Sequence, residues 1–227
     1  MKGVPRLSVV NAWAVGLLAA ACAGCMPHIM HGPRVEEDGV SGSLSLSVGR
    51  NYDAAGSELR IVPSLYGGVR RSWLPADGDG IAGSIGIQVP LLLAPLLADG
   101  ESGRFSILTS TSYVDTYIQP RRRSEAGIET GVGMLVSTAL VGPYLQAGVM
   151  REGGSGWYTT QAVAFTIGDE FGQGTFYLPA IAWRHRDPDL STAANFSAGM
   201  GVRLGADGES DTLFVLGVTL ELGLDRN

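Results

Sequence analysis

Residues 39–50, with the sequence GVSGSLSLSVGR, alternate between two kinds of side chain with a period of two. One face carries the apolar residues Val40, Leu44, Leu46 and Val48. The other face, between residues 41 and 49, carries only serine and glycine. A period of two is that of a β-strand, whose successive side chains point to opposite sides. In a soluble sheet the solvated face normally carries longer polar side chains, so this pattern does not fit one.

The same contrast recurs in three later stretches, 81–89, 128–136 and 214–224, where large apolar side chains oppose small or polar ones. Small side chains suit the crowded interior of a closed barrel, and apolar side chains outside it suit lipid. We therefore predict an all-β, antiparallel, up-and-down transmembrane barrel. Closure is required there, because an open edge would leave unpaired backbone groups in hydrocarbon.

Ten strands are predicted, because turn residues interrupt the alternation repeatedly and no stretch after residue 39 shows helical periodicity. They are expected at 39–50, 57–73, 81–93, 104–118, 126–138, 143–151, 157–168, 174–185, 194–205 and 211–225. Many exceed the about five or six residues usual in soluble proteins and reach the about nine to eleven that cross a bilayer at a tilt. A barrel of about eight strands is the second choice.

Residues 1–21 are expected to be a signal peptide, with Lys2 and Arg6 ahead of an apolar run from Val9 to Leu18. The stretch LLAAACAGC resembles a bacterial lipoprotein signal, in which a cysteine after small residues becomes the acylated N-terminus. We favour Cys22 as the lipid-attachment residue. Cys25 is the alternative, and ordinary cleavage without acylation is the third option.

Residues 22–38 contain proline, histidine and charges without periodicity, so we expect a lipid-anchored tether ahead of a barrel domain at 39–227. No cysteine follows Cys25, so the predicted barrel can hold no internal disulfide. His28 and His31 are too few ligands for a strong metal site, and we expect neither a metal nor a cofactor.

Charged residues make up only 17% of the 227 residues, against about 25% in a typical soluble domain. Such a chain is poorly equipped to face water on all sides. The formal net charge is -6, and loss of Lys2 and Arg6 with the signal peptide makes it -8. This acidity argues against nucleic acid as a partner.

Four large aromatic residues are predicted to form a girdle at one rim. If the chain enters from the periplasm, even-numbered strands end, and odd-numbered strands begin, at the periplasmic rim. By this rule Trp73, Tyr117, Trp157 and Trp183 all fall there. Amphipathic rings favour the headgroup level of a membrane, which supports the interpretation.

Five ionisable residues are predicted to point into the interior: Arg60, Arg70, Glu129, Arg203 and Glu221. Buried charges are costly unless they are paired or hydrated. These side chains therefore either form structural salt bridges that plug the barrel or line a watery path. The sequence leaves both roles open.

Over residues 39–227 the chain resembles the bacterial outer-membrane β-barrel proteins. Gly217, Leu220 and Leu222 match part of the C-terminal signal by which such barrels are recognised for assembly. The usual terminal aromatic residue is absent, since the chain ends LGLDRN. The resemblance implies a place in the bacterial outer membrane with its lipids as partners. Periplasmic proteins are further candidate partners, and we expect a monomer.

We expect a structural role or a narrow small-solute pore, and no enzymatic activity. The alternative is a periplasmic lipoprotein whose soluble β-barrel or sandwich binds an apolar ligand. A third hypothesis is a barrel-type lipid hydrolase, in which His185 and the nearby Asp187 would supply a base and a carboxylate. It is disfavoured, since His185 falls at the periplasmic rim and no G-x-S-x-G elbow accompanies it.

Overall fold

The computed structural model describes residues 31–35, 37–52, 60–76, 79–91, 112–121, 127–167, 174–187, 189, 191–205 and 210–224. Its strands are β1 (Gly39–Tyr52), β2 (Arg60–Trp73), β3 (Gly80–Pro90), β4 (Tyr113–Arg121), β5 (Gly127–Val136), β6 (Leu140–Met150), β7 (Gly156–Thr166), β8 (Gly174–Asp187), β9 (Thr192–Gly205) and β10 (Ser210–Gly223). A short helical turn, η2 (Glu152–Gly154), joins β6 to β7. Within these ranges no helix has the length and apolarity to span a membrane.

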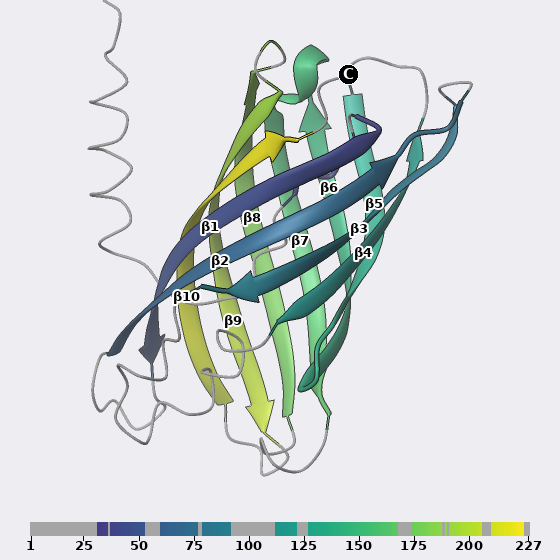
Figure 1. Ribbon diagram of the computed structural model, residues 1–227. Coiled ribbons are helices and arrows are strands. Elements are labelled where there is room, and N and C mark those ends of the chain that lie inside the picture. Colours follow the sequence, from purple (N-terminus) through teal and green to yellow (C-terminus); the bar gives the residue numbers. More distant parts are fainter. Residues whose placement is uncertain are drawn as a thin grey trace, which may run out of the picture.

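The ten strands form one closed antiparallel barrel, which confirms the predicted fold class and strand number (Figure 1). Neighbours in sequence pair with each other, and β1 closes the barrel against β10 from Ser41 opposite Gly223 to Tyr52 opposite Thr212. We call the end at which β1 begins and β10 ends the upper rim, as drawn in Figure 1, and the other end the lower rim. Because the ring of strands is closed, the wall has no edge strand.

The fourth strand was predicted at 104–118. Its described part, β4, runs from Tyr113 to Arg121 and pairs with β3 over its whole length. Pro120, which was assigned to the following turn, lies within the strand. Proline cannot donate to the ladder, but a strand position at its end tolerates it. Residues 104–111 lie outside the described part of the chain.

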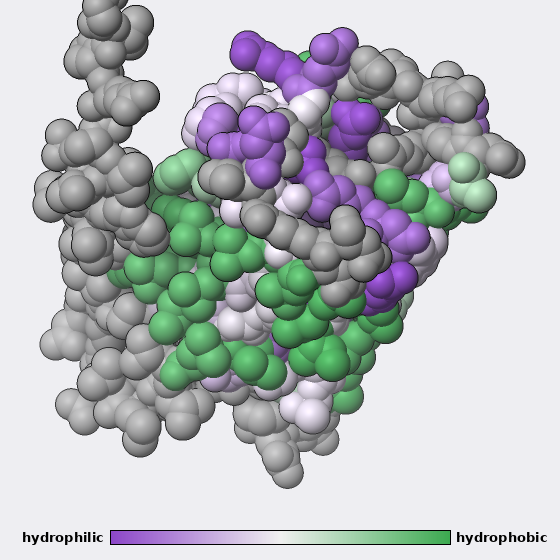
Figure 2. All heavy atoms as spheres, turned by 45° about the horizontal axis from the view of Figure 1, so that its top comes forward, coloured by the Kyte–Doolittle hydropathy of each residue, from purple (hydrophilic) through white to green (hydrophobic). Residues whose placement is uncertain are grey.

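The two faces of the strands are oriented as the alternation predicts. On β3, Ile85 and Ile87 are 47% and 56% exposed, whereas their neighbours Ser84 and Gln88 are 1% and 2% exposed. Every strand carries at least one large apolar side chain on the exposed outer face. Figure 2 shows hydrophobic residues on the barrel wall and hydrophilic residues gathered toward the upper end.

The lower half of the interior holds apolar side chains that pack into one cluster, beside the buried polar side chains of Gln88 and Arg203. The apolar side chains come from strand ends near the lower rim and include Tyr113, Leu135, Leu140, Phe176 and Leu213, each at most 4% exposed. Side chains from opposite parts of the wall meet here, as they do in small closed barrels. The upper half of the interior is polar and holds the candidate site.

Candidate functional site

A stretch of the N-terminal segment, His31–Val35, lies inside the upper half of the barrel. His31, Gly32, Pro33 and Val35 are buried. These residues were predicted to belong to a tether ahead of the barrel, and that prediction is wrong for this stretch, because the wall surrounds it and supplies its hydrogen-bond partners. We call His31–Val35 the plug segment. Residues 22–30 of the predicted tether, with Cys22 and Cys25, lie outside the described residues.

Side chains of the wall satisfy the backbone of the plug segment. Gln119 on β4 accepts a hydrogen bond from the Val35 amide through Oε1 at 2.8 Å. The Tyr117 hydroxyl donates to the Pro33 carbonyl at 2.8 Å. Gln146 on β6 donates through Nε2 to the His31 carbonyl at 3.0 Å. An irregular backbone is stable in a dry interior only when such partners exist, so these contacts fix the segment in place.

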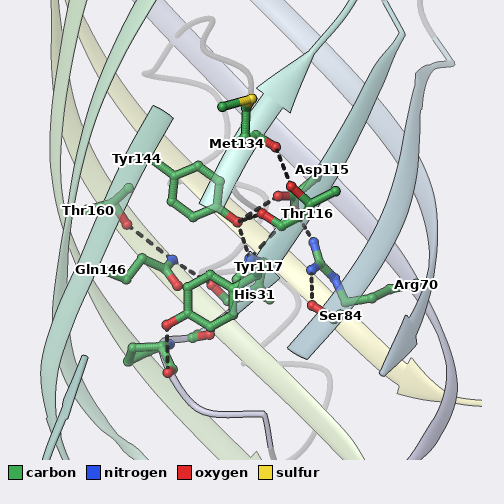
Figure 3. Close-up of polar contacts among 12 residues, drawn as sticks. His31, Arg70, Ser84, Asp115, Thr116, Tyr117, Met134, Tyr144, Gln146 and Thr160 are labelled. Carbon is green, nitrogen blue, oxygen red and sulfur yellow. Dashed lines mark hydrogen bonds and ion pairs between the residues drawn. The ribbon is translucent and has the colours of Figure 1, made fainter. Parts of the chain in front are cut away.

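The imidazole of His31 lies at the centre of the site (Figure 3). Its Nδ1 is 2.8 Å from the Gly32 carbonyl and therefore carries a proton. Its Nε2 is 2.9 Å from the Tyr144 hydroxyl and 3.5 Å from Oδ2 of Asp115. The ring also packs edge-on against Tyr117, with centroids 4.5 Å apart. His31 thus joins the plug segment to β4 and β6.

Asp115 on β4 is fully buried and is surrounded by donors. The guanidinium of Arg70 on β2 forms a salt bridge with its Oδ2. The Tyr144 hydroxyl donates to its Oδ1 at 2.6 Å. Arg70 in turn donates to the Ser84 hydroxyl at 2.7 Å. Because each charged group has a partner, the desolvation cost of the pair is offset, although such a pair is a stronger device for specificity than for stability.

His31 lies outside the strands, and its environment disfavours the charged imidazolium. Burial lowers the pKa of His31 to about 4, and the positive charge of Arg70 acts in the same direction. The negative charge of Asp115 opposes this shift. The imidazole is therefore neutral at pH 7.

Two glycines of β5 make room for the tyrosines that hold the plug segment. Tyr117 and Tyr144 stack nearly parallel, with centroids 6.0 Å apart and an interplanar angle of 4°. A Cβ on Gly131 would lie 2.2 Å from the Tyr117 hydroxyl, and one on Gly133 would lie 2.1 Å from the Tyr144 ring. The glycines of the sequence GVG therefore allow both rings to lie flat over β5.

A second polar cluster faces the plug segment from the opposite side. Arg184 on β8 donates to both carboxylate oxygens of Glu221 on β10, at 2.6 and 3.0 Å. Asn195 on β9 donates to Glu221 at 2.6 Å, and its carbonyl oxygen accepts from Tyr158 at 3.2 Å. The Arg184 stem passes so close to Gly32 that a Cβ there would lie 2.7 Å from it. Glycine at position 32 thus lets the segment lie against this cluster.

The predicted interior residues fall into separate groups. Glu129 contacts Gln119 and lies 3.8 Å from Arg34 of the plug segment, while Arg70 and Glu221 belong to the two clusters described above. Arg203 is buried near the lower rim beside Gly174, away from the plug segment. Arg60 begins β2, and its side chain lies outside what the structure describes.

Sequence reasoning missed the partners of these charges. Asp115, Arg184, Asn195, Gln119 and Gln146 all point inward. Asp115 was detectable, because it alternates with outward-facing Val114 and Thr116 in the sequence YVDTYIQ. Arg184 lies within the predicted strand 174–185 but was not assigned to the interior, and β8 runs on to Asp187. Pairing across the barrel is not visible from local spacing.

Three of the four predicted girdle residues lie on the outer face at the upper rim. Trp157 is 60% exposed and lies opposite Trp183 in the β7–β8 ladder. Trp73 is 42% exposed, and its ring covers Gly83 on the neighbouring strand. Tyr117 is different: it points into the interior and is 1% exposed, so its inclusion in the girdle was wrong. Its position in the alternation places it on the same face as Asp115.

The site offers hydrogen bonding and charge pairing rather than an evident reaction centre. A cavity of about 90 Å³ lies between the plug segment and the wall, beside Arg70, Arg184 and Glu221, which is room for a few water molecules. His185 lies on the outer face and stacks on Trp183, away from this interior. In the described ranges no three His, Cys, Asp or Glu side chains gather as a metal site would require.

No protein-family model matches the chain, and no curated protein matches it. Among solved structures, the chain is similar to the CymD monoaromatic hydrocarbon channel at 8% identity and a TM-score of 0.34, covering 99% of this chain and 96% of that one. It is similar to the S-type phycobiliprotein lyase CPES from Guillardia theta at 10% identity and a TM-score of 0.33, covering 84% and 90%.

A further similar structure is Ail, the attachment invasion locus protein of Yersinia pestis, at 12% identity and a TM-score of 0.28, covering 82% of this chain and 100% of that one. At these scores and identities the similarities assign no family or role to the chain.

Proposed function

We propose that this chain is a β-barrel of the bacterial outer membrane with a structural, non-conducting role. The observation that carries the proposal is the outer wall, where each of the ten strands exposes large apolar side chains. In water such a continuous surface would drive aggregation, since soluble monomers rarely expose apolar patches beyond a few hundred Å². In hydrocarbon the same surface is the stable one, and the closed ladder satisfies the backbone.

The contents of the interior favour a sealed barrel over a pore. The plug segment occupies the upper half and is bonded to β4 and β6. The apolar cluster with Tyr113, Leu135 and Phe176 lies in the lower half. An ion would have to pass both layers, and in the lower one the packed apolar side chains offer no replacement for water. The structural role is therefore preferred to the small-solute pore.

The same features argue against the soluble alternative. A periplasmic binder of apolar ligands needs an apolar cavity inside and a polar surface outside. Here the arrangement is reversed in the upper half, where the interior is polar and the wall around it is apolar. The hydrolase hypothesis receives no support from the interior either, because His185 lies on the outer face.

Two measurements on the intact protein test this proposal. The protein should resist extraction from membranes by salt and alkaline buffer, and should migrate differently in detergent gels before and after boiling. Release without detergent would contradict the membrane location. In planar bilayers the protein should give no stable single-channel currents, and discrete currents at neutral pH would contradict the sealed interior.

A matched pair of variants separates the two layers of the seal. A variant in which only His31–Val35 are replaced, by glycine and serine, should still give no currents, because the apolar layer remains. Combining this replacement with Phe176→Ala and Leu213→Ala should produce currents, since both obstructions are then reduced. Currents from the first variant alone would show that the plug segment is the whole seal.

A further inference from the structure

An apolar groove lies on the outer face where β7, β8, β9, β10 and β1 run side by side. Its volume is about 590 Å³, within the range of about 300–1,000 Å³ that is typical of ligand-sized clefts. The large side chains that line it are Leu46, Trp157, Ile181, Trp183, Phe196 and Leu216. None of the described residues that line the groove is charged.

The pairing of the strands explains why the wall is hollow here. On one rung of the sheet, the small side chain of Ala198 lies between Ile181 of β8 and Leu216 of β10. Two residues nearer the upper rim, Phe196 lies opposite Trp183, and the two rings stack with centroids 5.6 Å apart. A methyl group between two long aliphatic side chains therefore leaves a hollow bounded by aromatic rings.

The two hydroxyl side chains along the groove have partners within the wall. The Ser47 hydroxyl is 2.6 Å from that of Ser64, and the Ser197 hydroxyl donates to the Gly217 carbonyl at 3.4 Å. The groove thus presents hydrocarbon, and hydrocarbon offers neither a charge nor a hydrogen bond for recognising a polar headgroup. A ligand held here is recognised through the shape of an apolar chain.

We propose that this groove is a fixed site for one acyl chain of a phospholipid, whatever its headgroup. The inference rests on the proposed outer-membrane location, which places the wall in hydrocarbon. An empty hollow deprives its lining side chains of contacts, and a chain that fills the hollow regains them against the aromatic rings. The groove adjoins Trp157 and Trp183, at the rim assigned to the periplasm if the chain enters from that side. Phospholipids form that leaflet of an outer membrane.

The setting of the groove favours a lipid chain over a second copy of the protein. Exposed apolar side chains continue from it over the outer wall, among them Leu44 on β1 and Leu222 on β10, so the occupant is itself in hydrocarbon. In a two-fold pair centred on this face the same patch meets itself, so hollow would face hollow and neither would be filled. A flexible acyl chain needs no matching ridge.

Native mass spectrometry of the detergent-purified full chain tests the site, with phosphatidylethanolamine and phosphatidylglycerol of identical acyl chains added in equal amounts. We expect one retained lipid per chain and a ratio of the two lipids within about twofold of unity. Ala198→Leu should lower the retention of both lipids by about tenfold, because the added methyl groups overpack the hollow. Ala147→Leu on the outer face of β6, outside the groove, is the matched control and should retain lipid normally.

Tryptophan fluorescence locates the retained chain. Two variants each keep one tryptophan of the barrel, with phenylalanine at the other two positions: one keeps Trp183 in the groove and the other keeps Trp73 on β2. A phospholipid brominated on its acyl chains, which quenches at short range, is titrated into each. Quenching of Trp183 should saturate at one lipid per chain, whereas quenching of Trp73 should rise in proportion to the lipid added.

Unchanged retention by Ala198→Leu, saturation at Trp73 like that at Trp183, or a clear preference for one headgroup would overturn the inference. A dimer without bound lipid, or a chain that carries only covalently attached lipid, would overturn it as well. The fluorescence comparison needs no bulky substitution in the groove, so it decides the matter even if Ala198→Leu does not fold.

The proposed function is scored separately by heat-modifiable migration and alkaline extraction of the same samples. A membrane-integrated protein that retains no lipid refutes only the groove site. A protein released from membranes without detergent refutes the location of the barrel.

Discussion

Asp115 links three elements of the structure through one buried carboxylate. It pairs with Arg70 of β2, accepts from Tyr144 of β6 and faces His31 of the plug segment. Removing one member of such a group leaves the others desolvated without a partner, which costs more than the contact itself contributes. The residue scale is therefore where a single substitution has its largest effect on this protein.

Asp115→Ala should lower the free energy of unfolding by about 3–5 kcal/mol, because it leaves the Arg70 guanidinium buried without its carboxylate. Urea unfolding in detergent micelles, followed by tryptophan fluorescence, measures the change. The double variant Asp115→Leu with Arg70→Met should lose much less, since it removes both charges. A double variant as unstable as the single one would show that the charge pair is not the cause.

Acidification should weaken the docking of the plug segment through His31. The pKa of His31 is lowered from 6.5 to about 4 in the folded protein, so the unfolded chain binds a proton at a higher pH than the folded one. Its contribution to stability is fully present above about pH 6.5 and is lost as the pH falls toward 4, by roughly 3 kcal/mol in total.

Unfolding measured between pH 7 and 4 checks this, with His31→Gln as the comparison. Asp115, Arg70, Tyr144 and Tyr117 surround the imidazole and remain in both proteins, so the difference between the two pH profiles isolates His31. Parallel profiles over this range would refute the prediction.

The strands could be predicted because their physical signal is local. An alternation such as that of β3 records, residue by residue, which side chain faces out and which faces in. The plug segment has no such signal. Its conformation is set by Gln119, Tyr117 and Gln146, which come from strands far along the chain. The only indication in the sequence that the plug segment enters the barrel was that a short aperiodic stretch precedes a predicted interior rich in polar groups.

Gly133 on β5 provides a test at the level of the element. It lies opposite Tyr117 of β4 and Tyr144 of β6, so one side chain there would disturb both rings. Gly133→Val should destabilise the barrel by about 1–3 kcal/mol through overpacking. Gly42→Ala on β1 is the matched control, because its Cβ would make only ordinary contacts at 3.5 Å or more. Equal stability of Gly133→Val and the unaltered protein in urea titration would contradict this role.

At the scale of the whole molecule, the seam between β1 and β10 defines the barrel. Ten strands and their closure were predicted from strand count and the need to avoid an open edge, and the ladder from Ser41 to Tyr52 confirms closure. The register of that seam could not be predicted from the sequence. If β1 is shifted against β10 by two residues, the same side chains still face the interior.

A cysteine pair tests the seam directly. Leu46 lies opposite Val218, so Leu46→Cys with Val218→Cys should form a disulfide in a background in which Cys22 and Cys25 are replaced by alanine. The cross-linked protein should keep a faster migration than its reduced form after boiling in detergent. Leu46→Cys with Phe214→Cys, displaced along the strand, should not cross-link. Efficient cross-linking of the displaced pair would show that the register is wrong.

The position of the plug segment also bears on how the barrel closes. His31 contacts Tyr144, 113 residues later, and Val35 contacts Gln119, 84 residues later. Only the short stretch between Val35 and Gly39 separates these anchors from the strand that joins β10. Docking of the plug segment and closure of the barrel are therefore linked, because the same short stretch of chain connects the buried anchors to the strand that forms the seam.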